Sequence, residues 1–512
     1  MASNQLKSLL LLFAILSISF AHDHTNGHKC THGQKGFPEH EFMDVKEDNY
    51  DPDAPEEGRV LASYNNLRTY GYYGLLTGSF RTYMEETLGP AILDYFSAAL
   101  NVKYPVSGKL SYTGRSVCSV TTPSVLKSGV TADFFIMWDA QYDKPASSQA
   151  TTWVAESYSC ILATGTKRPL IAKTLVNSAV LVNPGSDVLL HEKNIYMILH
   201  ETTHTLGFST SLYPYFIDDN GNRLTGHITS GTLDGSTSVV INVEPLTSRL
   251  RTFFGCSTLK GAYMENSGSS ATSGEHFERR QFAFEAMTSG LIYQQSYSQF
   301  SLAMLEGSGW YVPDYDYADG YWFGQGNGCN FLFGSSSSVN SEFADFCTGS
   351  SRGCTVPGRG AGYCQSDIRS DGCKFNHPEV NYDCDNTAAA GYTQLSHLQS
   401  FGRDAYAKCF DGTLSDNSYS SQSTYCFQYN CVGSGSNTKL EVTVGSETLT
   451  CTEAGSMSVS GYHGYITCPD PLTFCSTVGA PVCPRGCMGR GNCVNGRCEC
   501  FSGYSGKDCA AI

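Results

Sequence analysis

Cysteine is the residue that most constrains this chain of 512 residues, which contains 22 of them. Twelve lie between Cys329 and Cys475, and six more follow between Cys483 and Cys509. A cytosolic protein would need metal clusters or redox chemistry to employ so many thiols, whereas their uneven spacing is typical of a disulfide framework. The sequence therefore predicts an oxidising compartment and a carboxy-terminal part held together by disulfides.

The amino terminus agrees with that compartment. Residues 9–20 form an apolar run behind Lys7, and Ser19 and Ala21 place small residues before a cleavage site. A membrane anchor is the alternative, but a spanning helix needs about 20 apolar residues. This run is shorter, and no other apolar run in the chain is long enough. The last residues offer no hydrophobic tail for a lipid anchor. We therefore expect a signal peptide over residues 1–21, no transmembrane segment in the mature chain, and a secreted, extracellular protein.

Net charge and composition exclude several classes of protein. Lys plus Arg number 33 against 48 Asp plus Glu, which gives a formal net charge of −15. Nucleic-acid binding and polybasic attachment to a membrane surface both need a basic footprint, so neither is expected. Aromatic residues at 12% argue against a disordered chain, and the length suggests about three domains.

Composition changes along the chain divide it into five parts, expected at residues 1–21, 22–59, 60–328, 329–478 and 479–512. The second is polar and acidic, and we interpret it as a pro-segment or a loose arm rather than a core. Helical periodicity over residues 82–100, interrupted by Gly89 and Pro90, and apolar strands at 134–138 and 170–175 predict a mixed α and β third part. The fourth part, rich in Ser, Gly and Tyr, predicts a disulfide-rich domain of short strands and loops.

The last part has six cysteines with the spacing C-x3-C-x5-C-x4-C-x-C-x8-C, and the sequence GYSG precedes the sixth. This pattern resembles an EGF-like module. The resemblance implies that Cys483 pairs with Cys493, Cys487 with Cys498, and Cys500 with Cys509. A metal-binding knuckle is the alternative, but no histidine is nearby.

The motif most directly tied to chemistry is HETTH, within the helical pattern of residues 194–208. His200 and His204 are four residues apart and therefore project from one side of a helix, where two imidazoles can share one zinc ion. Glu201 then lies near the open coordination position and can accept a proton from a zinc-bound water. Two surface histidines are the alternative explanation. Gly207 suits an abrupt helix end with a left-handed cap.

A catalytic zinc usually has three protein ligands. The short metzincin spacing would require a histidine where the chain has Thr210. His276 is the best candidate, because Met287 follows eleven residues later and metzincins place a methionine in a turn beneath the zinc. A carboxylate, Glu275 or Glu278, is the alternative ligand, and an ordinary core methionine is the alternative for Met287.

These motifs together, HETTHTLGFS, a long insertion, GEHFERR and EAMTSG, resemble leishmanolysin, a family of surface metalloproteases of trypanosomatids with relatives in other eukaryotes. The resemblance covers roughly residues 60–475. It implies an α+β fold with a metzincin-type catalytic domain over 60–328 and an insertion over 209–270. It also implies His200, His204 and His276 as ligands of one Zn²⁺ per chain, Glu201 as the general base, and Met287 as the Met-turn residue.

The sequence HKCTH at residues 28–32 resembles the inhibitory cysteine switch of that family, in which a pro-segment thiolate occupies the open zinc position. The alternative is that Cys30 forms a disulfide. Removing the pro-segment leaves an odd number of cysteines, so either one of them is free or Cys30 pairs. If one is free, Cys256 is the candidate among the three outside the cysteine-rich clusters (Cys118, Cys160 and Cys256).

Together these features predict a secreted zinc endopeptidase made as a zymogen, which hydrolyses peptide bonds of extracellular proteins. Its expected partners are protein or peptide substrates and cell-surface or matrix proteins, since the resemblance also implies a role in cell adhesion. The alternative is a catalytically inactive adhesion or matrix-binding protein that uses the EGF-like and cysteine-rich parts; a zinc-dependent amidase is a third. Tyr293 and Tyr297 follow the Met-turn, and we interpret them as packing residues.

Overall fold

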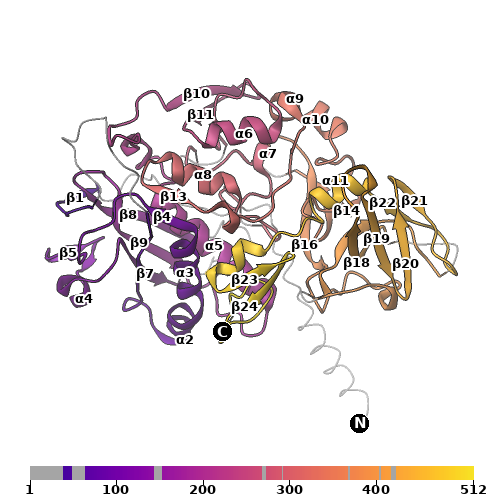
Figure 1. Cartoon of the computed structure of the whole chain (residues 1–512), viewed down its shortest axis with the longest axis horizontal. Coiled ribbons are helices and arrows are strands. Elements are labelled where there is room, and N and C mark those ends of the chain that lie inside the picture. Colours follow the sequence, from indigo (N-terminus) through magenta and orange to yellow (C-terminus); the bar gives the residue numbers. More distant parts are fainter. Residues whose placement is uncertain are drawn as a thin grey trace, which may run out of the picture.

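The computed structural model describes residues 39–48, 64–142, 153–267, 273–290, 292–366, 369–402, 405–416 and 422–511. The expected signal peptide and Cys30 lie outside these residues. Figure 1 shows a part with mixed helices and strands at one end, a β-rich part at the other, and the hairpin of the last residues between them. The chain therefore has the mixed α and β composition that the sequence predicts. No helix among the described residues combines the length and the apolar character needed to cross a membrane.

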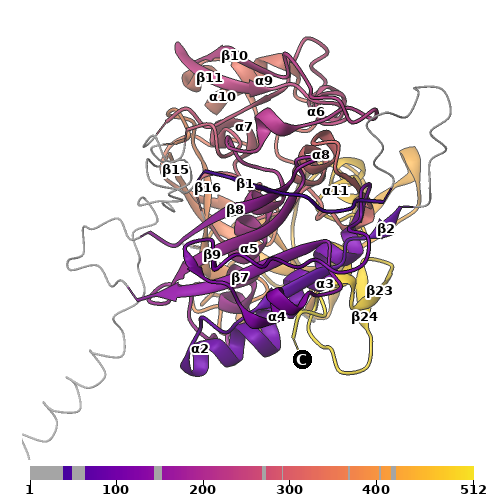
Figure 2. The ribbon, with the colours of Figure 1, turned by 90° about the vertical axis from the view of Figure 1, so that its left-hand side faces the viewer.

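A five-stranded sheet with the order β1-β8-β9-β7-β3 forms the base of the first part (Figure 2). Its strands are β1 (Glu41–Met43), β3 (Thr69–Tyr72), β7 (Phe134–Gln141), β8 (Ala155–Ala163) and β9 (Pro169–Asn177). Strands β3, β7 and β9 run parallel, β8 is antiparallel to β9, and β1 is parallel to β8. The two strands expected at 134–138 and 170–175 are thereby confirmed as β7 and β9.

Residues 39–48 correct the interpretation of the whole 22–59 segment as a loose arm. They add β1 to the edge of the sheet, and Met43 and Val45 pack against a buried cluster. Glu47, two residues further along the same face, is buried beside Arg168, with 3.5 Å between the carboxylate and Nε. Residues that face inward alternate along this segment with acidic and basic residues that face water. The high average polarity of the segment therefore concealed this alternation, which has the period of two typical of a strand.

Two helices and a π-helical turn form one continuous helical segment in place of the interrupted helix expected over 82–100. They are α2 (Gly78–Tyr83), the π-helical turn η1 (Met84–Leu88) and α3 (Gly89–Ala99). Pro90 has no N–H to donate, and the wider turn before it keeps the axis continuous. A Cβ on Gly89 would lie 2.6 Å from the carbonyl oxygen of Met84, so this tight turn requires glycine.

The first part also contains the long helix α5 (Val188–Leu206), which packs against β8 and β9, and a number of shorter elements. They are β2 (Asn65–Asn66), β4 (Leu100–Val102), β5 (Ser116–Val117), β6 (Val120–Thr121), α4 (Ser124–Ser128), η2 (Tyr213–Tyr215), β10 (Ile228–Leu233), β11 (Ser236–Ile241), α6 (Leu246–Phe254), β12 (Ala262–Tyr263), α7 (Arg279–Phe282), α8 (Gln299–Gly307), β13 (Tyr311–Pro313), η3 (Tyr315–Tyr317), α9 (Gly328–Phe333) and α10 (Ser336–Glu342). The expected insertion at 209–270 thus contains a hairpin and a helix of its own.

The carboxy-terminal part is built of short antiparallel sheets. Its elements are β14 (Arg352–Cys354), β15 (Gly360–Gln365), β16 (Phe375–Asp383), η4 (Ser396–Leu398), β17 (Lys408–Asp411), β18 (Thr424–Val432), η6 (Gly435–Asn437), β19 (Lys439–Val444), β20 (Glu447–Cys451), β21 (Gly455–Met457), β22 (Ile466–Cys468) and α11 (Pro471–Ser476). The last residues form η7 (Pro484–Gly489) and the hairpin of β23 (Gly491–Val494) and β24 (Arg497–Cys500). The largest hydrophobic cluster continues past residue 328, with Phe375, Met488 and Ala510 among its members, so the core does not end at the expected boundary.

Ten disulfides join the described cysteines, and the one between Cys256 and Cys329 shows that our expectation for Cys256 was wrong. Cys256 follows α6, and the backbone N–H of Gly326 donates to the carbonyl of Phe253, which brings Cys329 alongside. Among the cysteines that the structure describes, the free one is Cys373, which is buried. Burial raises the pKa of its thiol to about 11, which keeps it protonated and unreactive at neutral pH.

Candidate metal centre

Helix α5 carries the HETTH motif through the interior of the first part. Asp187 caps its amino terminus by accepting hydrogen bonds from the N–H groups of Leu189 and Leu190 at 3.1 and 3.0 Å. The Ser159 hydroxyl of β8 donates to the carbonyl of Thr205 at 2.6 Å. Every residue from 194 to 206 is buried, so the helix is held on all sides by the protein core.

The helix ends as expected after Leu206, but its cap differs from the expected one. Gly207 has φ 169°, which is extended backbone rather than the left-handed conformation. A Cβ there would lie 3.2 Å from Cδ2 of Leu305, so a larger residue would have to displace that leucine side chain by a few tenths of an ångström.

Three histidines converge at this helix. The Nε2 atom of His200 lies 3.0 Å from Nε2 of His204 and 3.2 Å from Nε2 of His276, and none of the three residues is more than 3% exposed. Nitrogen ligands at 2.0–2.1 Å from a tetrahedral zinc ion are about 3.3 Å apart. The structure thus brings together the three residues expected as ligands, at the spacing that one zinc ion requires.

Hydrogen bonds on the far side of the rings fix which nitrogens face each other. Nδ1 of His200 donates to the carbonyl of Ala286 at 2.7 Å, and Nδ1 of His204 donates to the carbonyl of Phe208 at 2.6 Å. A carbonyl can only accept, so the proton of each neutral ring is on Nδ1 and the Nε2 lone pair points into the cluster. Facing lone pairs at this distance repel each other unless a cation lies between them, and outer carbonyls of this kind commonly orient histidines bound to a metal. These residues therefore fit zinc.

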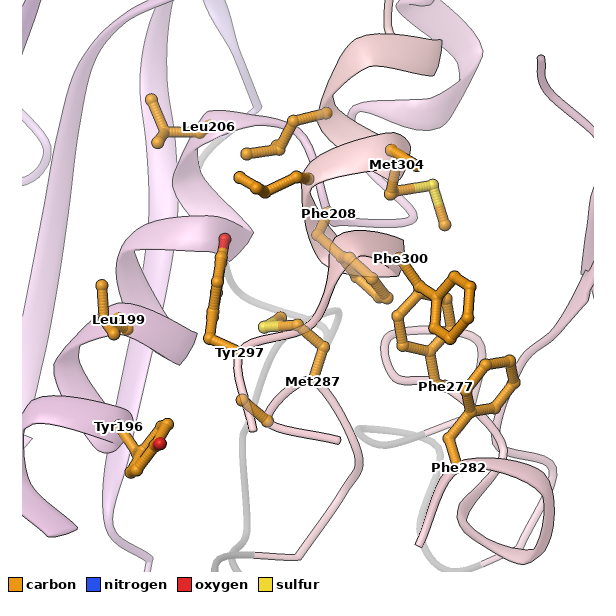
Figure 3. Packing of buried hydrophobic residues seen from close by; sticks show 14 of the residues in the cluster. Tyr196, Leu199, Leu206, Phe208, Phe277, Phe282, Met287, Tyr297, Phe300 and Met304 are labelled. Atoms are coloured by element: carbon orange, nitrogen blue, oxygen red, sulfur yellow. The ribbon is translucent and has the colours of Figure 1, made fainter. Parts of the chain in front are cut away.

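The turn around Met287 connects two of the ligand segments. The carbonyl of Ala286 holds His200, and the carbonyl of Met287 accepts the N–H of Phe277, the neighbour of His276, at 2.9 Å. Met287 is fully buried, and Figure 3 shows its side chain next to that of Tyr297. This arrangement suits the role of Met-turn residue proposed for Met287.

The two carboxylates named as alternative ligands have other tasks. Glu275 accepts hydrogen bonds from the N–H of Thr210, at 3.1 Å, and from its hydroxyl. Glu278 caps α7 by accepting the N–H of Arg280. Glu275 thereby ties the chain that leaves α5 to the segment of His276, and the histidine is the member of this segment that reaches the cluster. Glu201 follows His200 directly on α5 and is fully buried.

Glu285 is a buried carboxylate that the sequence interpretation did not select. It accepts hydrogen bonds from the N–H of Met287, from the N–H and hydroxyl of Ser298 at 3.1 and 2.9 Å, and from the hydroxyl of Ser301 at 2.6 Å. It therefore fastens the Met-turn to the start of α8. The available signal was an ionisable residue inside the apolar run FAFEAM, since charged residues are seldom fully buried without a partner.

Stability should depend on pH through Glu285. Burial raises the pKa of this carboxyl from 4.5 to about 7, although the surrounding donors oppose the change. Because the folded state binds the proton more tightly than the unfolded state, its contribution to stability is complete below pH 4.5 and is lost as the pH rises through 7. Between pH 5 and 8 the free energy of unfolding of the wild type should fall by about 2–3 kcal/mol relative to Glu285→Gln. Chemical denaturation at several pH values measures this difference, and parallel curves would contradict it.

A family model described as leishmanolysin matches residues 73–370, which is more than half of the chain. The chain belongs to the leishmanolysin family. A second model, described as tenascin EGF domain, matches residues 482–510, and the structure joins the three cysteine pairs that the EGF-like resemblance implied. Both resemblances are thereby confirmed. Because these six cysteines are all in disulfides, none supplies a thiolate for a metal-binding knuckle.

Named relatives of this leishmanolysin-family chain are peptidases of animals. The ciliated left-right organizer metallopeptidase of Danio rerio is 27% identical over 326 residues, covering 61% of this chain and 51% of the relative. Leishmanolysin-like peptidases of Caenorhabditis elegans and Drosophila melanogaster are 32% and 31% identical over 165 and 169 residues, covering 26% and 27% of this chain and 25% of each relative. The chain thus spans about half the length of the first relative and a quarter of the others.

Proposed function

We propose that this protein is a secreted zinc endopeptidase with a metzincin-type catalytic domain. The observation that supports it best is the group of three buried histidines with converging Nε2 atoms, on and beside a helix that also carries Glu201, in a chain of a peptidase family. The disulfides, the EGF-like module and the absence of a membrane-crossing helix among the described residues fit an extracellular protein.

The residues divide the chemistry between them. His200, His204 and His276 would hold the metal, and a zinc ion bound there supplies a Lewis acid that polarises the scissile carbonyl and acidifies water. Glu201 accepts a proton from the attacking water and later delivers it to the leaving amine. The carbonyls of Ala286 and Phe208 keep the histidine rings in the orientation and tautomer that this task needs.

The position of β1 supports synthesis as a zymogen. Its residues lie within the expected pro-segment, 22–59, and they cover the edge of β8, the strand that contacts α5 through Ser159. Exposed sheet edges bind extended peptides by adding a strand, and β8 offers such an edge next to the metal centre. A pro-segment strand on this edge would exclude a substrate until it is removed. Cys30, the proposed inhibitory switch, precedes that strand in the chain.

The test is a peptidase assay on casein and on a mixture of quenched peptides, with the secreted full-length chain before and after proteolytic removal of the pro-segment. We expect hydrolysis to appear on removal, to stop with a zinc chelator and to return with added zinc. A processed, zinc-loaded protein that cleaves no peptide would overturn the proposal and favour the adhesion alternative, and binding partners of the carboxy-terminal half would come next. Hydrolysis of small amides but not of peptides would indicate an amidase.

A further inference from the structure

The EGF-like module is packed into the part of the protein that carries the metal centre. Met488 and Ala510 belong to the same buried hydrophobic cluster as the residues of α5. Figure 1 shows the hairpin of β23 and β24 beside α3, with α5 close by. A module that served only for adhesion would be expected on a separate tether, so this docking calls for an explanation.

Arg485 links the module directly to the active-site helix. It is fully buried, and its Nη1 donates to the hydroxyl of Tyr196 at 2.6 Å. Its guanidinium carbon also lies 4.7 Å from the centre of the Tyr196 ring. Tyr196 precedes His200 by one helical turn on the same face of α5.

Two carboxylates complete the surroundings of Arg485. Nη2 donates to Asp508, the residue before the last cysteine of the module, and the backbone N–H of Arg485 donates to Asp319 at 2.9 Å. Asp319 belongs to the first part of the protein and also accepts the hydroxyl of Tyr196 at 3.0 Å. Arg485 is thus a buried cation shared between the module, the helix and the chain beyond η3. Removing one partner of such a buried charge strongly destabilises a protein, because the other charge is left uncompensated.

A second path leads from the same carboxylate to the helix. Asp319 accepts the N–H of Tyr297 at 2.8 Å, and the hydroxyl of Tyr297 lies 2.6 Å from that of Thr203. Thr203 stands between Glu201 and His204 on α5, and Figure 3 shows Tyr297 between this helix and Met287. Tyr297 therefore does more than the packing expected of it.

Contacts at the end of η7 fix how the module is docked. Arg490 is buried and donates to Asp94 of α3 at 2.9 Å. Gly489 has φ +70°, and a Cβ on it would lie 2.7 Å from Cβ of Ala98. Backbone of the module thus lies directly against α3, which leaves it little freedom to rotate.

We propose that the EGF-like module is a structural part of the catalytic unit and that Arg485 is a positioning residue, which holds α5 through Tyr196 so that His200 and Glu201 keep their orientation. The role in hydrolysis rests on the proposed function, whereas the effect on metal geometry does not. The module fixes the turn of α5 that precedes the first ligand, and Asp319 extends that support to the turn that contains the second.

The experiment compares full-length Arg485→Met, Arg485→Lys and Tyr196→Phe with the wild type. Arg497→Met is the matched control: Arg497 is exposed on β24, where its guanidinium lies over the ring of Tyr406. Each protein is loaded with Co²⁺ in place of zinc, and its visible absorption spectrum reports the ligand geometry without any need for activity. The kcat and KM for a quenched peptide are measured on zinc-loaded, processed protein.

We expect both Arg485→Met and Tyr196→Phe to change the cobalt spectrum. Arg485→Met should lower kcat at least ten-fold and Tyr196→Phe several-fold, and the KM of each should stay within two-fold of the wild type. Arg485→Lys, which keeps the charge, should restore part of the loss, and Arg497→Met should match the wild type. An unchanged spectrum and kcat in folded Arg485→Met would overturn the proposal. If that variant does not fold, Tyr196→Phe decides, because it removes only one hydroxyl. If the wild type cleaves no peptide, the proposed function fails and the cobalt spectra still decide the positioning role.

Discussion

Glu201→Gln is expected to lose peptide hydrolysis while its metal centre stays intact. The glutamine has almost the same shape, so a fully buried position on α5 can accept it, but an amide cannot take a proton from the attacking water. General acid–base catalysis of this kind contributes about 10²–10⁴-fold, so kcat should fall by that factor. The measurement is the rate of cleavage of a quenched peptide by processed protein, together with its zinc content.

Glu192→Gln provides the matched control. Glu192 is buried on the same helix and accepts two hydrogen bonds from Arg359 at 2.8 and 2.9 Å, so the same substitution there breaks an ion pair without touching the histidine cluster. It should lower stability and leave kcat nearly unchanged. Substantial activity in Glu201→Gln would show that another group is the base. Equal losses of kcat in Glu201→Gln and Glu192→Gln would show that α5 tolerates neither substitution and that the effect is structural.

The part of the site that repeats with the period of a helix was predictable from the sequence. His200, Glu201 and His204 lie within one helical turn, so their relative positions follow from helical geometry. His276 does not have this advantage, since the long insertion with its own hairpin and helix separates it from His204. It was selected because Met287 follows eleven residues later and because several motifs together resemble the family, and local reasoning alone left Glu275 and Glu278 open.

Features that depend on tertiary packing were not predictable. Counting cysteines by cluster could not show that α6 and α9 meet, and so the free cysteine was assigned to Cys256 instead of Cys373. The edge strand β1 was hidden because the segment that contains it is polar and acidic on average. Arg485 lies in η7, in the three-residue spacing between Cys483 and Cys487, where no periodic pattern distinguishes a buried arginine from an exposed one, and its role depends on the contact with Tyr196.

His276→Ala is expected to lower the affinity for zinc more than any other single substitution outside α5. His276 is fully buried and its Nε2 lies 3.2 Å from that of His200, so the alanine leaves a site with two ligands and a cavity on the third side. Loss of a hydrogen-bond partner behind a ligand typically costs 10–100-fold in affinity, so loss of the ligand itself should exceed about 100-fold. Competition with a fluorescent zinc chelator measures the change, and activity should fall with occupancy.

His227→Ala is the control for removing a buried imidazole. His227 lies in the insertion, where its Nε2 donates to the carbonyl of Tyr213 at 2.8 Å, outside the cluster. Its replacement should affect stability and leave the zinc affinity unchanged. If His276→Ala bound zinc as tightly as this control, the third ligand would have to be a carboxylate, and Glu275 and Glu278 would each be replaced next. A loss of zinc affinity in His276→Ala but not in His227→Ala would instead support the three histidines as the metal ligands.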